Sequence, residues 1–403
     1  MMTTLANYHH FDGLPWATGY LVNALAYQGA LAPHTGKPYT EALLMGINGG
    51  LSAGYYAFAY EGYDPHLHFL TRYPFNEEPG AVFERLAIPQ ESRTTTDPLK
   101  GVANVIDGLV AGKPVIVWLD HLTLGAGDLS VPQEYWMINP VLVFGYDREA
   151  GTVQIANRAR VPFTVSTDTF AAARARIAKT RHRIMTIGTP DADRLPLAVE
   201  TGIRACIDIF TGNPPVGTPS NWGFAAYDKW IGLLTKPKGK QAWAKMFAPG
   251  AKMYAGLTST YKYIEVFFTG GCGARHIYAD FLDEAADILR KPALRDAAQE
   301  FRTAANLWRA FTAALLPDSI APFREARELM VRDYNLFIAQ GAAADTERKQ
   351  IDTRLKALRQ HMETDFPLSE TEATTMREAL AAHVRGIAAV EQLAIAALKE
   401  ALV

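Results

Sequence analysis

Apolar and polar residues follow two different patterns along the chain, and the pattern changes near residue 190. Before that point, short apolar runs are separated by glycine, proline and aspartate, as in strands and helices joined by turns. After residue 195, apolar residues recur every three or four positions over long stretches, which predicts helices. A cluster of glycine, proline and aspartate at 188–193 separates the two patterns. We therefore expect a mixed domain over residues 1–190 and a helical domain over residues 191–403.

The first domain combines apolar runs of strand type with helical stretches. Residues 114–119 form a continuous apolar run rich in β-branched side chains, which predicts a central strand buried on both faces. Runs at 141–146 and 152–156 flank a turn-rich spacer and predict a hairpin. The pattern also predicts helices at 21–30, 39–45 and 98–111 and strands at 53–60 and 66–72. These elements indicate an α+β fold with a largely antiparallel sheet.

The second domain is expected to be a bundle of helices. Ser369 and Glu372 have the spacing of a capping box and open a last helix. The apolar stripe of that helix is expected to pack on its own bundle, with an interface between copies as the alternative; it comprises Met376, Leu380, Val384, Ile387, Ala394 and Leu398. Helical spacing predicts the other helices at 203–210, 278–289, 305–316 and 323–337, and the mixed charges at 345–359 indicate a solvated helix face.

Composition and charge exclude several classes of protein. The chain has 403 residues, 49% of them hydrophobic, which is enough for two cores. Its net charge of -2 gives no electrostatic footprint for nucleic acid or an anionic membrane. No uninterrupted apolar window of about 18 residues predicts a membrane span, and the N-terminus lacks the basic flank and apolar core of a signal peptide. With two cysteines, the chain fits a reducing compartment, so we expect a cytoplasmic protein.

Several blocks of the sequence occur in the order found in a known family: residues 10–13 followed by 18–23, 46–50 followed by 55–56, 114–120, 139–147, 264–265, 269–275 and 278–285. In this order they resemble the butirosin biosynthesis protein H family, which joins an N-terminal domain like the C39 peptidases to a helical domain of unassigned function. The resemblance covers residues 8–315 and implies a papain-like fold for the first domain.

The resemblance implies acyl transfer from the thioester of a carrier protein to an amine of a small molecule, by way of a cysteine. This chemistry needs a thiolate, a histidine that moves the proton and a third polar group that orients the imidazole. In the papain-like arrangement the thiol lies at the N-terminus of a buried helix, where the helix dipole stabilises the thiolate.

The residue types that this chemistry needs are absent from the matching positions. The resemblance places Trp16 where the thiol belongs and Asn139 or Pro140 where the histidine belongs. The third polar position falls near Asn157. An indole cannot act as a nucleophile and would fill the acyl pocket. We therefore expect a degenerate active site.

Other residues offer relocated acid–base chemistry. His10, beside His9, precedes the expected catalytic helix and could act as a base, although a histidine near a chain start is more often only exposed. Asp120 and His121 close the central strand, where polar side chains often face a cleft and do acid–base work near neutral pH. The favoured alternative is that both satisfy backbone groups at the end of the strand.

Cys272 is the candidate for a relocated nucleophile. It lies in a glycine-rich turn just before a helix that contains Arg275 and His276, and such surroundings would lower the pKa of a thiol. The favoured alternative is a packing turn between helices, because glycine often allows close approach. Cys206 lies within an apolar helix and is expected to be a small core residue.

Four residues make up the expected substrate-binding set. Arg158 and Arg160 follow the predicted hairpin and could bind a carboxylate or the phosphate of phosphopantetheine. Exposed hairpin arginines without a ligand are the favoured alternative. Trp16 and Tyr56 complete the set.

No motif calls for a metal or a cofactor. The glycines at 46–50 lack the Gly-Lys-Ser/Thr ending of a phosphate loop. His66 and His68 share one face of a predicted strand, but no carboxylate or cysteine lies in register to complete a zinc site. We therefore expect neither group.

Three hypotheses follow for the function. In the preferred one, the chain is a degenerate homologue that serves as a binding or accessory protein of a biosynthetic pathway, with an acyl carrier protein, an active paralogue or a small molecule as its partner. A homo-oligomer is compatible with this role. In the alternative, the chain is an active acyltransferase that uses Cys272 or holds donor and acceptor together without a covalent intermediate, since proximity alone lowers a barrier. A peptidase that clips leader peptides, the third hypothesis, also needs the missing thiol.

Overall fold

The computed structural model describes residues 2–12, 18–72, 80–125, 137–156, 159–212, 219–266 and 269–403. Contacts between Cα atoms group the chain into two compact units, each assembled from several stretches. Unit 1 contains Met1–Leu44, Asn76–Ala198 and Asp333–Asp352. Unit 2 contains Met45–Phe75, Val199–Arg332 and Thr353–Val403. Both units are discontinuous in sequence. The single domain boundary expected between residues 190 and 191 stays a prediction.

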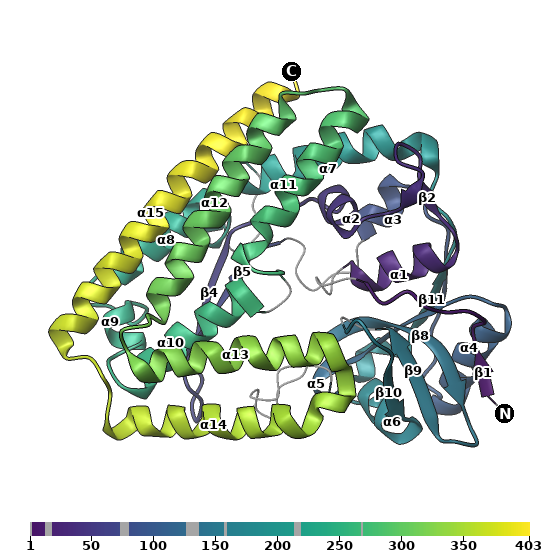
Figure 1. The fold of residues 1–403 in the computed structure, drawn as a ribbon, viewed down its shortest axis with the longest axis horizontal. Helices are drawn as coiled ribbons and strands as arrows, with labels where there is room; N and C mark the ends of the chain where they lie inside the picture. The colour runs from purple at the N-terminus through teal and green to yellow at the C-terminus, as the bar shows by residue number, and fades with distance from the viewer. Residues whose placement is uncertain are drawn as a thin grey trace. The chain divides into compact units, whose positions relative to one another are not determined.

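Unit 1 is built on an antiparallel sheet (Figure 1), and this confirms the predicted α+β class with its mainly antiparallel sheet. The strand order is β10-β9-β8-β7-β11-β6, and β1 pairs with β8. The strands are β1 Met2–Thr4, β6 Gln90–Arg93, β7 Val115–Asp120, β8 Ile138–Asp147, β9 Thr152–Ala156, β10 Phe163–Ser166 and β11 Ile184–Ile187. A separate two-stranded sheet consists of β2 Leu31–Ala32 and β3 Lys37–Pro38.

The predicted central strand and hairpin are both confirmed. All six residues of β7 are buried, and β7 lies between β8 and β11. Strands β8 and β9 pair antiparallel across a turn in which the Asp147 carboxylate accepts hydrogen bonds from the backbone N–H groups of Glu149 and Ala150. A carboxylate that accepts hydrogen bonds from the backbone of its own turn explains why the spacer reverses the chain here.

Helices cover both faces of the sheet. The helices whose residues lie wholly in unit 1 are α1 Gly19–Tyr27, α3 Gly80–Arg85, α4 Pro98–Val110, α5 His121–Leu124 and α6 Thr167–Ala175, and α2 Glu41–Ile47 begins in this unit. Helix α4 begins at an Asp97 N-cap whose carboxylate accepts from the N–H groups of Leu99 and Lys100, followed by proline at the first position. The helices predicted at 21–30, 39–45 and 98–111 correspond to α1, α2 and α4.

The side chains of β7 show which helix lies on which face. A Cβ built on Gly108 of α4 would lie 2.6 Å from Cγ2 of Val115, so Val115 points toward α4. Trp118, three residues further along the strand, points to the opposite face. Its ring lies 4.2 Å from the Arg183 guanidinium, and that guanidinium is close enough to the Tyr20 hydroxyl of α1 for its charge to act on it. The odd-numbered residues of β7 therefore face α4, and the even-numbered ones face α1.

Unit 2 is mainly helical, as predicted for the C-terminal part (Figure 1). A hairpin of β4 Gly54–Phe58 and β5 His66–Leu70 belongs to it, which confirms the strands predicted there. Its helices include α7 Leu195–Thr211, α8 Gly223–Thr235, α9 Trp243–Met246, α10 Ala251–Tyr261, α11 Arg275–Leu289, α12 Leu294–Leu315 and α15 Glu370–Ala401. Helices α13 Ala321–Gln340 and α14 Asp345–Thr364 have residues in both units.

The last helix opens and packs as the sequence predicts. The Ser369 hydroxyl accepts from the Glu372 N–H while the Glu372 carboxylate accepts from the Ser369 N–H, which is a complete capping box. Most of the predicted stripe is buried, and α15 packs against α8 and α12. Among the described helices, α15 is long and apolar enough to cross a membrane by composition. Its buried face carries the ion-paired Glu391, an arrangement typical of a core helix.

Candidate functional site

The N-terminus of α1 is the place where the resemblance puts the catalytic thiol. Helix α1 begins at Gly19 and is almost wholly buried along its first two turns. Its N-cap residue, Thr18, makes no side-chain capping bond; its hydroxyl instead donates to the Glu41 carboxylate at 2.7 Å. Trp16 lies outside the described residues, and so do Asn157 and Arg158. The roles expected for these three residues remain predictions.

The register of β8 separates the two residues that compete for the histidine position. Pro140 lies opposite Trp118, and Asn139 lies opposite Leu119. Directly opposed residues of an antiparallel pair share a face of the sheet. Pro140 therefore faces α1, whereas Asn139 faces α4. A proline ring has no group that accepts or returns a proton.

Asn139 is a core residue with an unsatisfied amide. Its side chain is fully buried, and neither its Oδ1 nor its Nδ2 has a hydrogen-bond partner among the residues that the structure describes. A buried polar group in this state costs about 1–3 kcal/mol of stability. Since the amide points to the α4 face, it does not stand in for an imidazole beside α1.

Asp120 at the end of β7 is a structural carboxylate. It caps α5 by accepting from the N–H groups of Leu122 and Thr123, and it also accepts from the Thr123 hydroxyl and from the Met137 N–H at 2.8 Å. Nε of Arg176 lies 3.4 Å from its Oδ2. With its side chain 1% exposed, the carboxylate joins the end of β7, α5 and the start of β8, as the favoured alternative for this residue supposed.

The Asp120→Asn substitution is expected to lower the free energy of unfolding by about 2 kcal/mol, because an amide replaces a buried anion that accepts several bonds and pairs with Arg176. Chemical denaturation measures the effect. The matched control is Asp97→Asn at the N-cap of α4, where the cap is exposed. Asparagine is a good N-cap residue, so this control should change stability by less than about 0.5 kcal/mol. Equal effects at both positions would contradict the structural role of Asp120.

The other acid–base and binding candidates come from different segments of the chain. His10 is half-buried beside His9, at 4.2 Å between ring centroids, and burial lowers its pKa. The His121 side chain is buried, and its backbone N–H donates to the Met137 carbonyl. Arg160 is exposed, and its N–H donates to the Ile338 carbonyl. Tyr56 belongs to unit 2, where its ring meets Trp222 edge-on at 5.7 Å.

Cys272 lies in a left-handed turn of the backbone. All residues from Gly270 to Ala274 have positive φ, with 51° at Cys272. Each non-glycine residue in this region costs about 1–2 kcal/mol. The Cys272 N–H donates to Oε2 of Glu265, and Oε1 of Glu265 accepts from the Thr312 hydroxyl. These bonds hold the turn between a π-helical stretch, Lys262–Val266, and α11.

The expectation that its surroundings lower the Cys272 pKa is wrong. The residue is 3% exposed, and burial, reinforced by the Glu265 carboxylate, raises the thiol pKa to about 11. The charge of Arg275, which was expected to favour a thiolate, is paired with Glu391. Cys206 is fully buried, donates to the Leu51 carbonyl and has its pKa raised to about 11 as well.

Both thiols should therefore react slowly in the folded protein. At pH 8, we expect iodoacetamide to label native Cys206 and Cys272 about 100-fold more slowly than the same residues in urea, because the thiolate is the nucleophile and its fraction falls tenfold per pH unit below the pKa. The native rate should rise as pH rises toward 11, the value to which burial raises both pKa values. Peptide mapping by mass spectrometry gives the two rates separately. Rapid native labelling of Cys272 would show that a thiolate is available.

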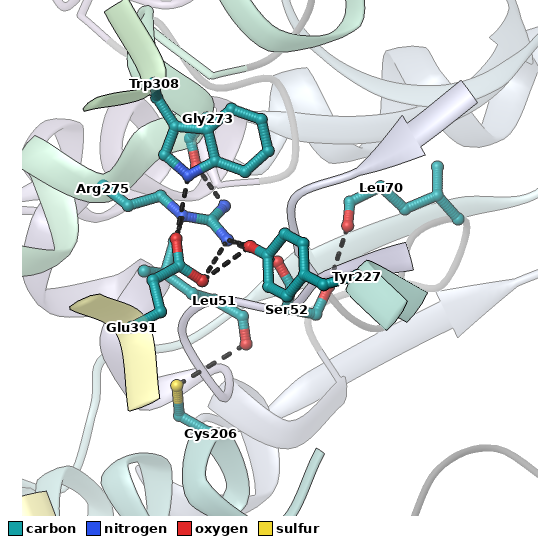
Figure 2. Close-up of polar contacts among 9 residues, drawn as sticks. All are labelled: Leu51, Ser52, Leu70, Cys206, Tyr227, Gly273, Arg275, Trp308 and Glu391. Carbon is teal, nitrogen blue, oxygen red and sulfur yellow. Dashed lines mark hydrogen bonds and ion pairs between the residues drawn. The ribbon is translucent and has the colours of Figure 1, made fainter. Parts of the chain in front are cut away.

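A buried ion pair forms the polar centre of unit 2 (Figure 2). Arg275 and Glu391 are both 0% exposed, with Nε of the arginine 2.7 Å from Oε1 of the glutamate. The Glu391 carboxylate also accepts from Nε1 of Trp308 at 2.8 Å and from the Tyr227 hydroxyl at 2.7 Å. Nη1 of Arg275 donates to the Gly273 carbonyl oxygen, and Nη2 donates to the Ser52 carbonyl oxygen.

This cluster is structural, and its acid, Glu391, was not among the residues predicted from the sequence. Each charge is neutralised by the other, and the bond to Ser52 ties the glycine-rich segment before β4 to the helices of unit 2. The signal for Glu391 was present in the sequence. It follows Ile387 by one helical turn and so occupies the apolar stripe of the last helix, where an acid needs a partner.

His66 and His68 do share one face of β5, with ring centroids 4.9 Å apart. The His68 ring stacks on Tyr263 at 4.2 Å, and burial lowers its pKa to about 3. Within the described part of the chain, no group of three or more histidine, cysteine, aspartate and glutamate residues is arranged to hold a metal ion. His66 and His68 are therefore neutral imidazoles packed against neighbouring rings.

Comparisons with known proteins match two family descriptions. Residues 17–158 match the N-terminal domain of butirosin biosynthesis protein H. Residues 169–330 match a domain of unknown function, DUF4872. A search of curated proteins gave no match. The first matched segment contains α1, β7 and β8, and the second contains the Cys272 turn and Arg275.

Proposed function

The chain belongs to the butirosin biosynthesis protein H family, and from this premise we propose that it is a catalytically degenerate relative of carrier-protein-dependent acyltransferases. In this role it binds an acyl carrier protein, an active paralogue or a small-molecule ligand as an accessory protein of a biosynthetic pathway. The first unit serves as a papain-like scaffold for this binding. No covalent acyl-enzyme is formed.

The burial of both cysteines is the observation that carries this proposal. The chain has two cysteines in all, and burial raises the pKa of each to about 11. An acyl group passes from one thioester to another only through a thiolate that the donor can reach. The burial of both thiols therefore supports a role in which neither acts as the nucleophile.

The residues at the expected catalytic positions support the same conclusion. The resemblance assigns the thiol position to Trp16, and the β8 register favours Pro140 over Asn139 as the residue that faces α1. Neither an indole nor a pyrrolidine ring performs nucleophilic or acid–base steps. What remains is a scaffold suited to binding.

Intact-protein mass spectrometry after incubation with acyl thioesters of N-acetylcysteamine tests the proposal. We expect no acyl adduct, and an unchanged result for Cys272→Ala. If a non-hydrolysable thioether analogue raises the melting temperature of the protein, this shows that the analogue binds without transfer. An adduct that maps to Cys272 and disappears in Cys272→Ala would overturn the proposal and establish an active enzyme.

Transfer without a covalent intermediate is the second candidate function. It needs no thiolate and so agrees with the burial of both thiols, and a site that holds donor and acceptor together lowers the barrier through proximity alone. The incubation distinguishes it: thioester consumption that depends on an added amine, with no adduct on the protein, would assign this activity.

A further inference from the structure

Helix α4 carries apolar side chains on the face that it turns away from the sheet. Leu99 is 82% exposed and Val110 is 71% exposed. Between them, three half-buried apolar residues continue the same face at helical spacing. We call this set the α4 stripe: Leu99, Val102, Ala103, Ile106 and Val110. The opposite face of α4 already packs in unit 1 through Gly101, Asn104, Val105, Gly108 and Leu109.

An exposed apolar stripe on a helix marks an interaction surface, because folding alone gives no reason to keep it. The charges beside it indicate what binds there. Helix α4 has two charged residues, Lys100 and Asp107. They lie about two helical turns apart and therefore on the same flank of the stripe. Both are exposed.

We propose that the α4 stripe is an interface between two copies of this chain, in which the α4 helices pack antiparallel about a twofold axis. In this arrangement Leu99 of each copy lies against Val110 of the other. A twofold axis across the interface keeps each flank on its own side, so Lys100 meets Asp107 of the second copy, twice.

The charge pattern selects this occupant and this orientation. In a parallel pair the twofold axis runs along the helices and puts the same flank of the two copies on opposite sides of the interface, so the contacts between Lys100 and Asp107 do not form. The antiparallel pair also opposes the two helix dipoles. Asp107 already has one neighbouring cation, because Arg93 at the edge of the sheet lies 3.6 Å from its carboxylate. The Asp107 side chain is nevertheless exposed and can be reached by a second copy. One helix face is small for a dimer interface, so we expect association at about 10–100 µM.

Analytical ultracentrifugation of the full chain at about 1–200 µM tests the proposal, this range spanning the expected association. The wild type should shift from monomer to dimer. The double substitution Leu99→Asp with Val110→Asp should weaken association at least tenfold, and because both side chains are exposed, its melting temperature should stay near that of the wild type. A wild type that stays monomeric throughout the range, or a double variant that dimerises as the wild type does, would overturn the proposal.

A charge exchange tests the orientation. Lys100→Asp should weaken the dimer at least tenfold, and Lys100→Asp combined with Asp107→Lys should restore it, because the exchanged pair is again complementary. The matched control is Lys252→Asp, an exposed lysine in the first turn of α10, which should leave association unchanged. A combined variant that is as weak as Lys100→Asp alone would contradict the antiparallel pairing.

Discussion

Replacing Glu391 by glutamine is expected to lower the free energy of unfolding by about 3–5 kcal/mol, the largest effect of any single polar substitution considered for this chain. The carboxylate receives bonds from Arg275, Trp308 and Tyr227, and none of these groups is accessible to water. Glutamine turns one acceptor into a donor and leaves the guanidinium charge buried without its counter-ion. Urea denaturation followed by circular dichroism measures the loss.

The matched control is Glu200→Gln. Glu200 also pairs with an arginine, Arg204, at 2.6 Å, but both side chains are partly exposed on α7. Exposed ion pairs on helices contribute about 0.3–0.5 kcal/mol, so the control should barely change the free energy of unfolding. Tyr227→Phe adds a graded comparison: it removes a hydroxyl bonded to both charges without stranding either, and should cost about 1–2 kcal/mol. If Glu391→Gln costs no more than Glu200→Gln, the cluster does not stabilise unit 2.

Gly202→Ala is expected to cost about 3 kcal/mol, because it forces two backbones apart. A Cβ at residue 202 would lie 2.2 Å from the Gly46 carbonyl oxygen and 2.9 Å from Cα of Ile47. Backbone atoms cannot rotate away as a side chain would, so α7 must move off the chain at the end of α2. The thermal unfolding midpoint measures the effect.

Gly232→Ala and Gly386→Ala are the controls for this prediction. Both glycines lie inside helices, α8 and α15, with no atom within 4 Å of an added Cβ. Alanine favours the helical conformation over glycine by about 1 kcal/mol. These two variants should therefore be slightly more stable than the wild type. A stable Gly202→Ala variant would show that α7 does not pack against the backbone at Gly46.

Local patterns were sufficient to predict most elements of this fold. The continuous apolar run of β7, the Asp147 turn and the Ser369 capping box are each determined by residues close in sequence. Such short-range features have the same physical consequences in any fold. The grouping of Met45–Phe75 with the helices depends instead on long-range contacts, such as the bond from Arg275 to the Ser52 carbonyl. Periodicity carries no information about those contacts.

The candidate site was harder to predict from sequence. The choice between Asn139 and Pro140 required the pairing register of β7 and β8, because neighbouring strand residues point to opposite faces. The thiol pKa of Cys272 depended on burial and on Glu265 rather than on the cations that follow it in sequence. A glycine-rich turn with a cysteine resembles a reactive site whether its thiol is exposed or buried.

Introducing a cysteine and a histidine at the proposed catalytic positions tests the central claim most directly. The measurement is the intact mass of two variants after incubation with acyl thioesters: Trp16→Cys with Pro140→His, and Trp16→Cys with Asn139→His. Since Pro140 faces α1 and Asn139 faces α4, the first variant should acquire one acyl group on the new cysteine. The second should acquire it no faster than Trp16→Cys alone. Acylation of the wild type, or equal rates in the two double variants, would contradict the account of a papain-like scaffold that has lost its thiol and its imidazole.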